Sequence, residues 1–500
     1  MSYQVPVAYA APEAAAIPSV LVGDELKQFA GMRSIIKYLP SASGTSISPS
    51  SSLLFNIPAE PYGYIKPNSM YLKGSVTVTW NAAVSAAGDT YGIAFAGNTQ
   101  MGKLPIVPFI TDATTITAAT QGTTIVHGAG GASSLLNRVT VTLPGGVSMS
   151  YGQHHHWRNA VIPHALSAAY VQLDLREAEH AGAVRNLVAA VAGTVAASPI
   201  QTFFFSIPMD VPVFNGSTAF PMLLCNGGIS MEIVTSSLGE AFTATSAGAG
   251  AAATPVTYEM KNVGLVYEVL QVSSEFKQAL VATRGDRGYM IHVADRTVVG
   301  PVGVTSSTRY NFGVGLSSCK GVLFTEYSQT NSGQVRQPKG YMANALDYYS
   351  VFRDGVQMTI PNINSADVAY SEMQRTLGRI GDSNITSAVS IPPRNIADTN
   401  SHTSYSFSGA GSFLGGCSFQ NISDWSFAAQ GSPADQLAIE IYKAASTQTT
   451  NDGIPTNLTQ VQYAERWGRG YVREDSFLLI WVLYDSVVVV LPDGTCQVRK

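Results

Sequence analysis

The chain has 500 residues and a formal net charge of −4, with no long acidic or basic run, so bulk charge does not favour a nucleic-acid partner. A chain of this length exceeds one ordinary core and predicts at least two domains. Only 12% of its residues are charged, about half of the roughly 25% usual in soluble domains. This composition indicates either an unusually neutral soluble protein or a chain that hides much of its surface against other subunits.

Strand-forming segments dominate the chain. They are short, rich in β-branched and aromatic residues, and several alternate between apolar and polar positions. Long Gly-, Ser-, Thr- and Pro-rich connections lie between them, which predicts a sandwich or jelly roll rather than alternating strands and helices. In chain order, the predicted strands cover residues 53–58, 75–80, 137–143, 202–208, 229–236, 263–272, 321–327 and 436–443.

The most apolar run of the sequence lies near its end, at residues 477–491. It is too short for a membrane-spanning helix and carries Asp485 near its centre. Its β-branched and aromatic content, followed by the turn Pro492-Asp493-Gly494, predicts two consecutive buried strands.

Helical signals are fewer. Residues 175–193 have high helix propensity and end at a glycine, and residues 273–285 begin with a serine cap and also end at a glycine. Residues 458–467 are a third candidate. In the N-terminal segment, Lys27, Arg33 and Lys37 lie on a short helix-like stretch.

Composition suggests where the chain divides. Low-complexity segments at 41–52 and 239–255 read as a linker and a surface loop. We expect an N-terminal arm at 1–40, a first sandwich at 41–275, a connector at 276–295 and a second sandwich with the C-terminal strands at 296–500. Each half is long enough for one eight-stranded sandwich.

The four cysteines, Cys225, Cys319, Cys417 and Cys496, stand far apart and form no CxxC pair. Zinc and thioredoxin-type sites are therefore disfavoured, and the pattern is that of a reducing compartment, although disulfides stay open. The first 27 residues lack the basic region of a signal peptide, so we expect none.

The stretch at residues 149–164 is the strongest candidate for a metal or catalytic site, because it holds half of the eight histidines. On a strand, His154 and His156 would point the same way and could share a metal ion. No acidic residue follows until Asp174, so the HxH pattern of cupin metalloenzymes fails at its next ligand. We interpret the run as a loop, in which His154, His155, His156, Trp157 and Arg158 contact another subunit. Imidazoles there would make that contact sensitive to pH near neutrality.

Three weaker motifs are better explained as structure. Residues 97–104 match GxxxxGK, but Leu104 replaces the Ser or Thr that would hold Mg²⁺ and Pro105 opposes the helix. Arg284-Gly285-Asp286 matches a cell-attachment tripeptide at the expected inter-domain turn. In residues 465–475, arginines alternate with aromatic residues as in base-stacking segments, but acidic residues dilute the charge. No catalytic motif emerges, and we expect neither enzymatic activity nor a cofactor.

Several segments resemble the double jelly-roll major capsid proteins of icosahedral double-stranded DNA viruses, the lineage of adenovirus hexon, large DNA viruses, virophages and polintons. In that family a strand ends in Ile-Pro, a Pro-aromatic segment crosses the subunit, and a proline precedes another strand. The matching positions are Ile207, Pro208, Pro212, Phe214, Pro221 and residues 229–233. Further similar segments follow in the family's order at 135–150, 262–293, 317–324 and 413–423, with departures at Ser418, at 222–227 and at the turn Pro144-Gly145-Gly146.

The resemblance implies an all-β fold of two tandem eight-stranded jelly-roll β-sandwiches with long loops and a few short helices. It also implies a homotrimer that forms a pseudo-hexameric capsomer, and neighbouring capsomers that tile a virion shell after synthesis in the host cytoplasm and assembly there or in the nucleus. Penton and minor capsid proteins, and an internal membrane or membrane protein, are further expected partners, without sequence-specific nucleic acid. By the same resemblance, the arm at 1–40 would lie inside the shell or clasp a neighbour.

Two alternatives stay open. A minor or vertex jelly-roll capsid protein would be expected to have one sandwich rather than two. A carbohydrate-active β-sandwich enzyme or a cupin-like metalloenzyme would need a carboxylate pair or a complete metal site, and neither is evident in the sequence.

Overall fold

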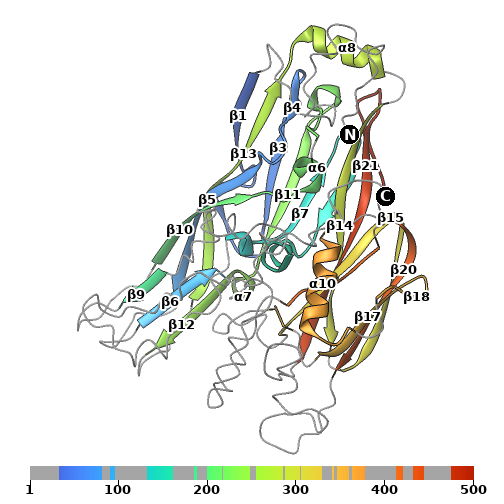
Figure 1. Cartoon of the computed structure of the whole chain (residues 1–500). Helices are drawn as coiled ribbons and strands as arrows, with labels where there is room; N and C mark the ends of the chain where they lie inside the picture. Colours follow the sequence, from blue (N-terminus) through green and yellow to red (C-terminus); the bar gives the residue numbers. More distant parts are fainter. Residues whose placement is uncertain are drawn as a thin grey trace, which may run out of the picture.

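Two apolar cores organise the protein (Figure 1). The computed structural model describes residues 33–80, 90–95, 132–161, 185–188, 200–216, 218–247, 255–284, 288–304, 306–328, 341–342, 346–359, 363–377, 413–419, 432–443 and 475–500. In this part of the chain no helix is long and apolar enough to cross a membrane.

The first sandwich consists of two antiparallel sheets that face each other across one core. We call the first the outer sheet; it has the order β1 (Arg33–Pro40), β13 (Pro255–Gln271), β5 (Tyr71–Trp80), β10 (Ile200–Pro208), with β2 (Ser46–Ile47) and β4 (Gly63–Ile65) also paired to β13. The facing sheet has the order β3 (Ser52–Ile57), β11 (Ile229–Thr235), β7 (Leu136–Thr142), β8 (Ser148–Tyr151). A small third sheet joins β12 (Phe242–Ala247), β6 (Thr90–Phe95) and β9 (Arg185–Val188).

Alternation of apolar residues decides which side of each strand enters the first core. In β3, Leu53, Phe55 and Ile57 are buried while the residues between them are exposed, and β11 alternates in the same way. Side chains on a strand point alternately to opposite faces, so this pattern fixes the register in which the two strands pair.

The second sandwich is built from one continuous hydrogen-bonded sheet. Its order is β14 (Tyr289–Val304), β21 (Ser476–Val490), β15 (Thr308–Ser328), β20 (Ser432–Lys443), β17 (Leu346–Arg353), β18 (Val356–Gln357). The short strands β16 (Tyr341–Met342) and β19 (Gly415–Ser418) pair with β15, and β22 (Cys496–Arg499) pairs with β21.

The strand β15 bends this sheet into two layers. Its first part, from Thr308 to Cys319, pairs with β20, and its last part, from Cys319 to Ser328, pairs with β21. Within the first part the register shifts twice, and Gly315 has a φ of 55°, which a glycine adopts without steric cost. Bulges bend a strand and let it pass from one layer of a sandwich to the other.

Short helices connect the strands. The two longest in the described ranges are α8 (Ser274–Arg284), which precedes β14, and α10 (Ala366–Thr376), which packs against β19 (Figure 1). The others are η3 (Ala132–Leu135), α3 (His154–His156), η4 (Trp157–Val161), α6 (Pro212–Asn215), η5 (Met222–Leu224) and α7 (Leu238–Ala241).

The strands β14 and β21 run through both halves of the protein as a long antiparallel pair (Figure 1). At one end of β21, Leu478 and Ile480 belong to the second core; at the other end, Val488 and Val490 belong to the first. The prediction of two separate strands over residues 477–491 is therefore wrong. No turn-forming residue interrupts the run, and the polar Asp485 at its centre stays in the strand because Lys320 and Ser318 bind its carboxylate.

The predicted strands in both halves and the helix over 273–285 are confirmed, within shifts of a few residues at most ends.

Two helical predictions are wrong. Residues 33–40 form β1, which pairs with β13 along its whole length, and residues 185–188 form β9 within the stretch expected to be helical. In both cases pairing with a distant strand overrides local propensity. The remaining residues of 1–32 and 175–193, and the candidate helix 458–467, lie outside the described residues.

Candidate functional site

The histidine run lies at the junction between the two sandwiches of the same chain. His154–His156 form the short helix α3, and η4 continues from Trp157. The Trp157 ring meets Trp481 of β21 edge-on with 5.9 Å between centroids, and the His156 ring lies 4.5 Å from that of Tyr327 in β15. An apolar cluster around Trp157 and Trp481 fills the space between the halves. The expectation of a loop is wrong, because these rings bury the segment as a helical turn.

A carboxylate, Asp210, anchors the polar part of this junction. It accepts hydrogen bonds from Trp157 Nε1 at 2.5 Å and Asn215 Nδ2 at 3.2 Å, and Arg296 Nη2 lies 3.0 Å from its Oδ2. Arg296 belongs to β14, and its guanidinium stacks 4.2 Å from the centre of the Trp157 ring. One cation from the second half thus binds an acid and an aromatic ring of the first.

Neighbouring groups and burial shift the pKa values of the two carboxylates in this cluster, Asp210 and Asp295. Burial raises the pKa of Asp210, but the guanidinium groups of Arg296 and Arg158 outweigh it and hold that pKa below its usual value. Burial also raises the pKa of Asp295, although this carboxylate accepts hydrogen bonds from the Arg296 backbone N–H at 2.8 Å and from Tyr484 Oη at 3.0 Å. The result is a structural ion-pair network that spans the two sandwiches.

His154 is fully buried at this junction, and neither of its ring nitrogens has a hydrogen-bond partner among the described residues. Burial, together with the nearby positive charges of Arg296 and Arg158, lowers its pKa to about 3, against the opposing effect of Asp210. His154 is therefore neutral at neutral pH. The expectation that this histidine titrates near neutrality in the folded protein is wrong, because burial and the charges of Arg296 and Arg158 disfavour its cation more than Asp210 favours it.

We expect the buried neutral His154 to make the folded state sensitive to acid. Its folded pKa lies below the ordinary value of 6.5, so stability falls as the pH drops below about 6.5, at about 1.4 kcal/mol per pH unit. Between pH 6.5 and pH 5 the loss should be about 2 kcal/mol. Urea unfolding of the protein and of His154→Leu at both pH values measures it. The variant should lose clearly less stability than the wild type; equal losses would show that His154 does not control the acid response.

The metal interpretation of the run gains no geometric support. Residues two apart on a helix point about 200° away from each other, so His154 and His156 do not form the pair that a strand would give. Among the described residues no three His, Cys, Asp or Glu side chains converge. His155, Trp157 and Arg158 are also mostly buried within the chain; their contact with another subunit stays a prediction.

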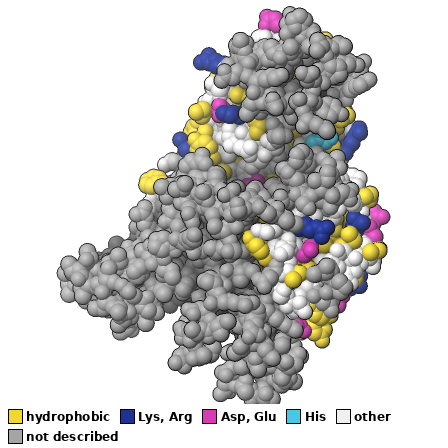
Figure 2. Space-filling model, in the orientation of Figure 1, with side chains coloured by type: hydrophobic (Ala, Val, Ile, Leu, Met, Phe, Trp, Pro, Cys, Tyr) yellow, Lys and Arg dark blue, Asp and Glu magenta, His cyan; other side chains and the backbone are white. Residues whose placement is uncertain are grey.

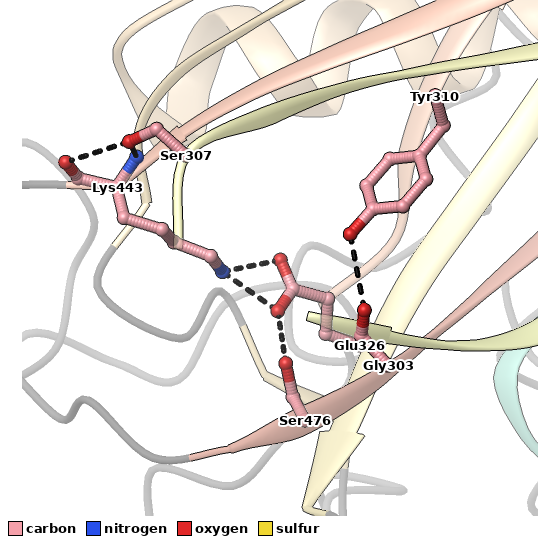
Figure 3. A network of polar contacts seen from close by, with 6 residues as sticks. All are labelled: Gly303, Ser307, Tyr310, Glu326, Lys443 and Ser476. Atoms are coloured by element: carbon pink, nitrogen blue, oxygen red, sulfur yellow. Dashed lines mark hydrogen bonds and ion pairs between the residues drawn. The ribbon is translucent and has the colours of Figure 1, made fainter. Parts of the chain in front are cut away.

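Two further ion pairs are buried in the second sandwich. Both carboxylate oxygens of Glu326 in β15 accept hydrogen bonds from Lys443 Nζ at 2.6 Å, and Oε2 also accepts one from Ser476 at 2.6 Å (Figure 3). In the second pair, Lys320 Nζ lies 2.7 Å from Asp485 Oδ1. Sequence reasoning missed both pairs, because the partners lie on strands far apart in the chain.

Three large apolar side chains are exposed on the outer sheet of the first sandwich. Ile36 and Tyr38 of β1 and Phe204 of β10 are 73%, 52% and 76% exposed, among the largest values for apolar side chains in the described chain. Phe204 is paired with Ser75 on β5, whose neighbours Gly74 and Val76 face the core, so these side chains point away from it. Figure 2 shows apolar side chains along the upper left flank, where Figure 1 draws β1. We call Ile36, Tyr38 and Phe204 together the exposed patch. They lie on β1 and β10 at the two ends of the strand order, and charged side chains of β5 and β13 share the sheet face between them.

Most residues of the other sequence candidates lie outside the described part of the chain. Arg284 is the last residue of α8, while Gly285 and Asp286 lie outside the described residues, so cell attachment stays a prediction. Residues 97–104 and nearly all of 465–475 also lie outside them.

The two halves together define a class: an all-β chain of two tandem jelly-roll sandwiches. No protein-family model and no curated protein sequence matches the chain. Among solved structures it is similar to a chain of the Sputnik virophage determined by cryo-EM, with a TM-score of 0.53 and 10% identity, over 100% of this chain and 92% of that one. This likeness confirms the double jelly-roll fold that the sequence resemblance predicts.

Two other similar structures are major capsid proteins. That of mavirus has a TM-score of 0.48 and 8% identity, over 100% of this chain and 95% of that one. That of Faustovirus has a TM-score of 0.43 and 10% identity, over 93% and 92%.

Proposed function

We propose that this chain is a structural, non-enzymatic major capsid protein. Three copies form a trimer whose six sandwiches make a pseudo-hexagonal capsomer, and capsomers tile an icosahedral shell together with penton and minor capsid proteins. The observation that carries the proposal is the pair of jelly-roll cores joined by the long strands β14 and β21. The fold is similar to that of a Sputnik virophage chain over the whole length of the present chain.

Surface chemistry supports an assembling protein. Charged residues make up only 12% of the chain, and the exposed patch presents three large apolar side chains on one sheet face. Large exposed apolar side chains on a weakly charged protein favour burial against another molecule. A minor or vertex protein would be expected to have one sandwich, so the two cores favour the major capsid protein over that alternative. The carbohydrate-active and cupin-like alternatives have no observation in their favour among the described residues.

The test is the oligomeric state of the purified protein, measured by size-exclusion chromatography with light scattering. The expected result is a trimer over a wide range of concentration. A monomer at every concentration would contradict the proposal.

The exposed patch gives a sharper prediction for the subunit contact. Phe204→Ser should weaken trimer formation about tenfold or more, because a large aromatic anchor contributes about 1.4 kcal/mol or more to such an interface. The matched control is Val356→Ser in β18 of the second sandwich, where the side chain is 64% exposed. If Phe204→Ser and Val356→Ser both assemble like the wild type, the patch is not the contact.

A further inference from the structure

The C-terminal turn of the chain folds back onto the first sandwich. After β21, the segment from Leu491 to Thr495 makes a tight turn, closed by the Gly494 N–H to Leu491 O hydrogen bond of 2.9 Å. The Asn226 N–H donates to Gly494 O at 2.9 Å, and the Cys496 N–H donates to Pro144 O at 2.7 Å. The last strand of the second half is therefore hydrogen-bonded to two turns of the first.

Two cysteines meet at this contact. Cys225 follows the 3-10 turn η5, directly before Asn226, and Cys496 begins β22. The Asn226–Gly494 hydrogen bond brings their two segments together, and each thiol shifts the pKa of the other. The Cys225 thiol itself donates to Pro221 O at 3.5 Å. Cys496 is part of the first core, and Cys225 packs against that same core. Both are present as thiols in this structure.

The two thiols differ in access and in acidity. Cys225 is half-buried, whereas Cys496 is almost fully buried. The Cys225 thiol holds the pKa of Cys496 below its ordinary value, against the effect of burial, and the same interaction raises the pKa of Cys225. A small oxidant can therefore reach Cys225, while Cys496 is the better nucleophile within the pair.

The other two cysteines provide an internal comparison. Cys319 and Cys417 are buried in the second core. Burial raises the pKa of Cys319 to about 12 and also raises that of Cys417. Unlike the half-buried Cys225, both are almost fully buried, so a small disulfide does not reach them.

We propose that Cys225 and Cys496 are a latent cross-linking site, which closes into an intramolecular disulfide by exchange with a small-molecule disulfide such as oxidised glutathione. Cys225 loses its proton and attacks the glutathione disulfide, which forms a mixed disulfide and releases one glutathione thiolate. The Cys496 thiolate then attacks Sγ of Cys225 and expels the second thiolate. The two protein thiols lose two electrons and two protons, and the oxidised glutathione becomes two molecules of the reduced form.

This cross-link would fasten the C-terminal strand of the second sandwich to the first sandwich. The chain stays unlinked in a reducing compartment and closes in an oxidising one. The inference does not depend on the proposed function, because both cysteines lie within one chain.

The test is to incubate the native protein with oxidised glutathione, then count thiols in denaturant and map disulfide-linked peptides by mass spectrometry. The expected result is a fall from four thiols to two, one linked peptide pair that contains Cys225 and Cys496, and a melting temperature higher by about 5 °C, reversed by dithiothreitol. Cys225→Ser and Cys496→Ser should each abolish the linked pair and the rise in melting temperature.

Three outcomes would overturn the proposal: four thiols that persist, glutathione that stays attached to Cys225 in the native protein, or a linked pair that involves Cys319 or Cys417. The wild-type peptide map decides among these outcomes by itself, even if a serine variant fails to fold.

Discussion

Replacing Lys443 with methionine should lower the free energy of unfolding by about 3–5 kcal/mol, because breaking a buried ion pair leaves an uncompensated charge in the core. Lys443 and Glu326 are among the least exposed charged residues of the described chain, with side chains 3% and 0% exposed. Their contact joins β20 to β15, and Ser476 of β21 binds the same carboxylate (Figure 3). Urea-induced unfolding of the wild type and the variant, followed by circular dichroism, measures the loss.

The matched control is Lys261→Met. Lys261 pairs with Glu259 at 2.9 Å, but both side chains are more than 40% exposed, so its loss should change stability by at most about 1 kcal/mol. The double variant Lys443→Met with Glu326→Leu removes both charges and should regain much of the lost stability. Equal effects of Lys443→Met and Lys261→Met would show that burial does not strengthen the Glu326–Lys443 pair.

Replacing Arg296 with methionine should lower the free energy of unfolding by about 3 kcal/mol. This change leaves Asp210 without its 3.0 Å cation and removes the guanidinium stacked on Trp157. The apolar stem of methionine keeps some of the packing against the ring. Differential scanning calorimetry should show a single transition at a clearly lower temperature for the variant, because β14 and β21 still join the two cores.

Arg309→Met is the control for this change. Arg309 also stacks on an aromatic ring, that of Phe352 at 4.1 Å, but it is exposed and belongs to the second sandwich alone. Its loss should leave the transition temperature nearly unchanged. An unchanged transition temperature in Arg296→Met would contradict the contribution of this residue to the junction between the halves.

The fold followed from the sequence where local pattern and final structure agree. The alternation in β3 and β11 indicated buried and exposed faces, and the serine and glycine that bound residues 273–285 marked the limits of α8. Such features depend on residues two to four positions apart, so they are visible in one dimension.

The candidate site could be predicted only in part. The sequence singled out His154–Arg158 as unusual, but it could not show that Asp210 and Arg296 complete the cluster. Neither residue belongs to a motif, and only the crossing of β14 over the first sandwich brings Arg296 to Trp157. Likewise, no spacing along the chain connects Lys443 with Glu326.

The sequence by itself thus determined the all-β class, the presence of two halves and most of the strand positions, because these depend on side-chain periodicity and chain length. Tertiary structure decided the rest: that residues 33–40 pair as a strand, that residues 477–491 serve two cores, that the histidine run is a helical turn with a buried neutral His154, and that the segments of Cys225 and Cys496 lie side by side. Each of these depends on contacts between residues far apart in the chain, whose energies outweigh local preference and leave no trace in local pattern.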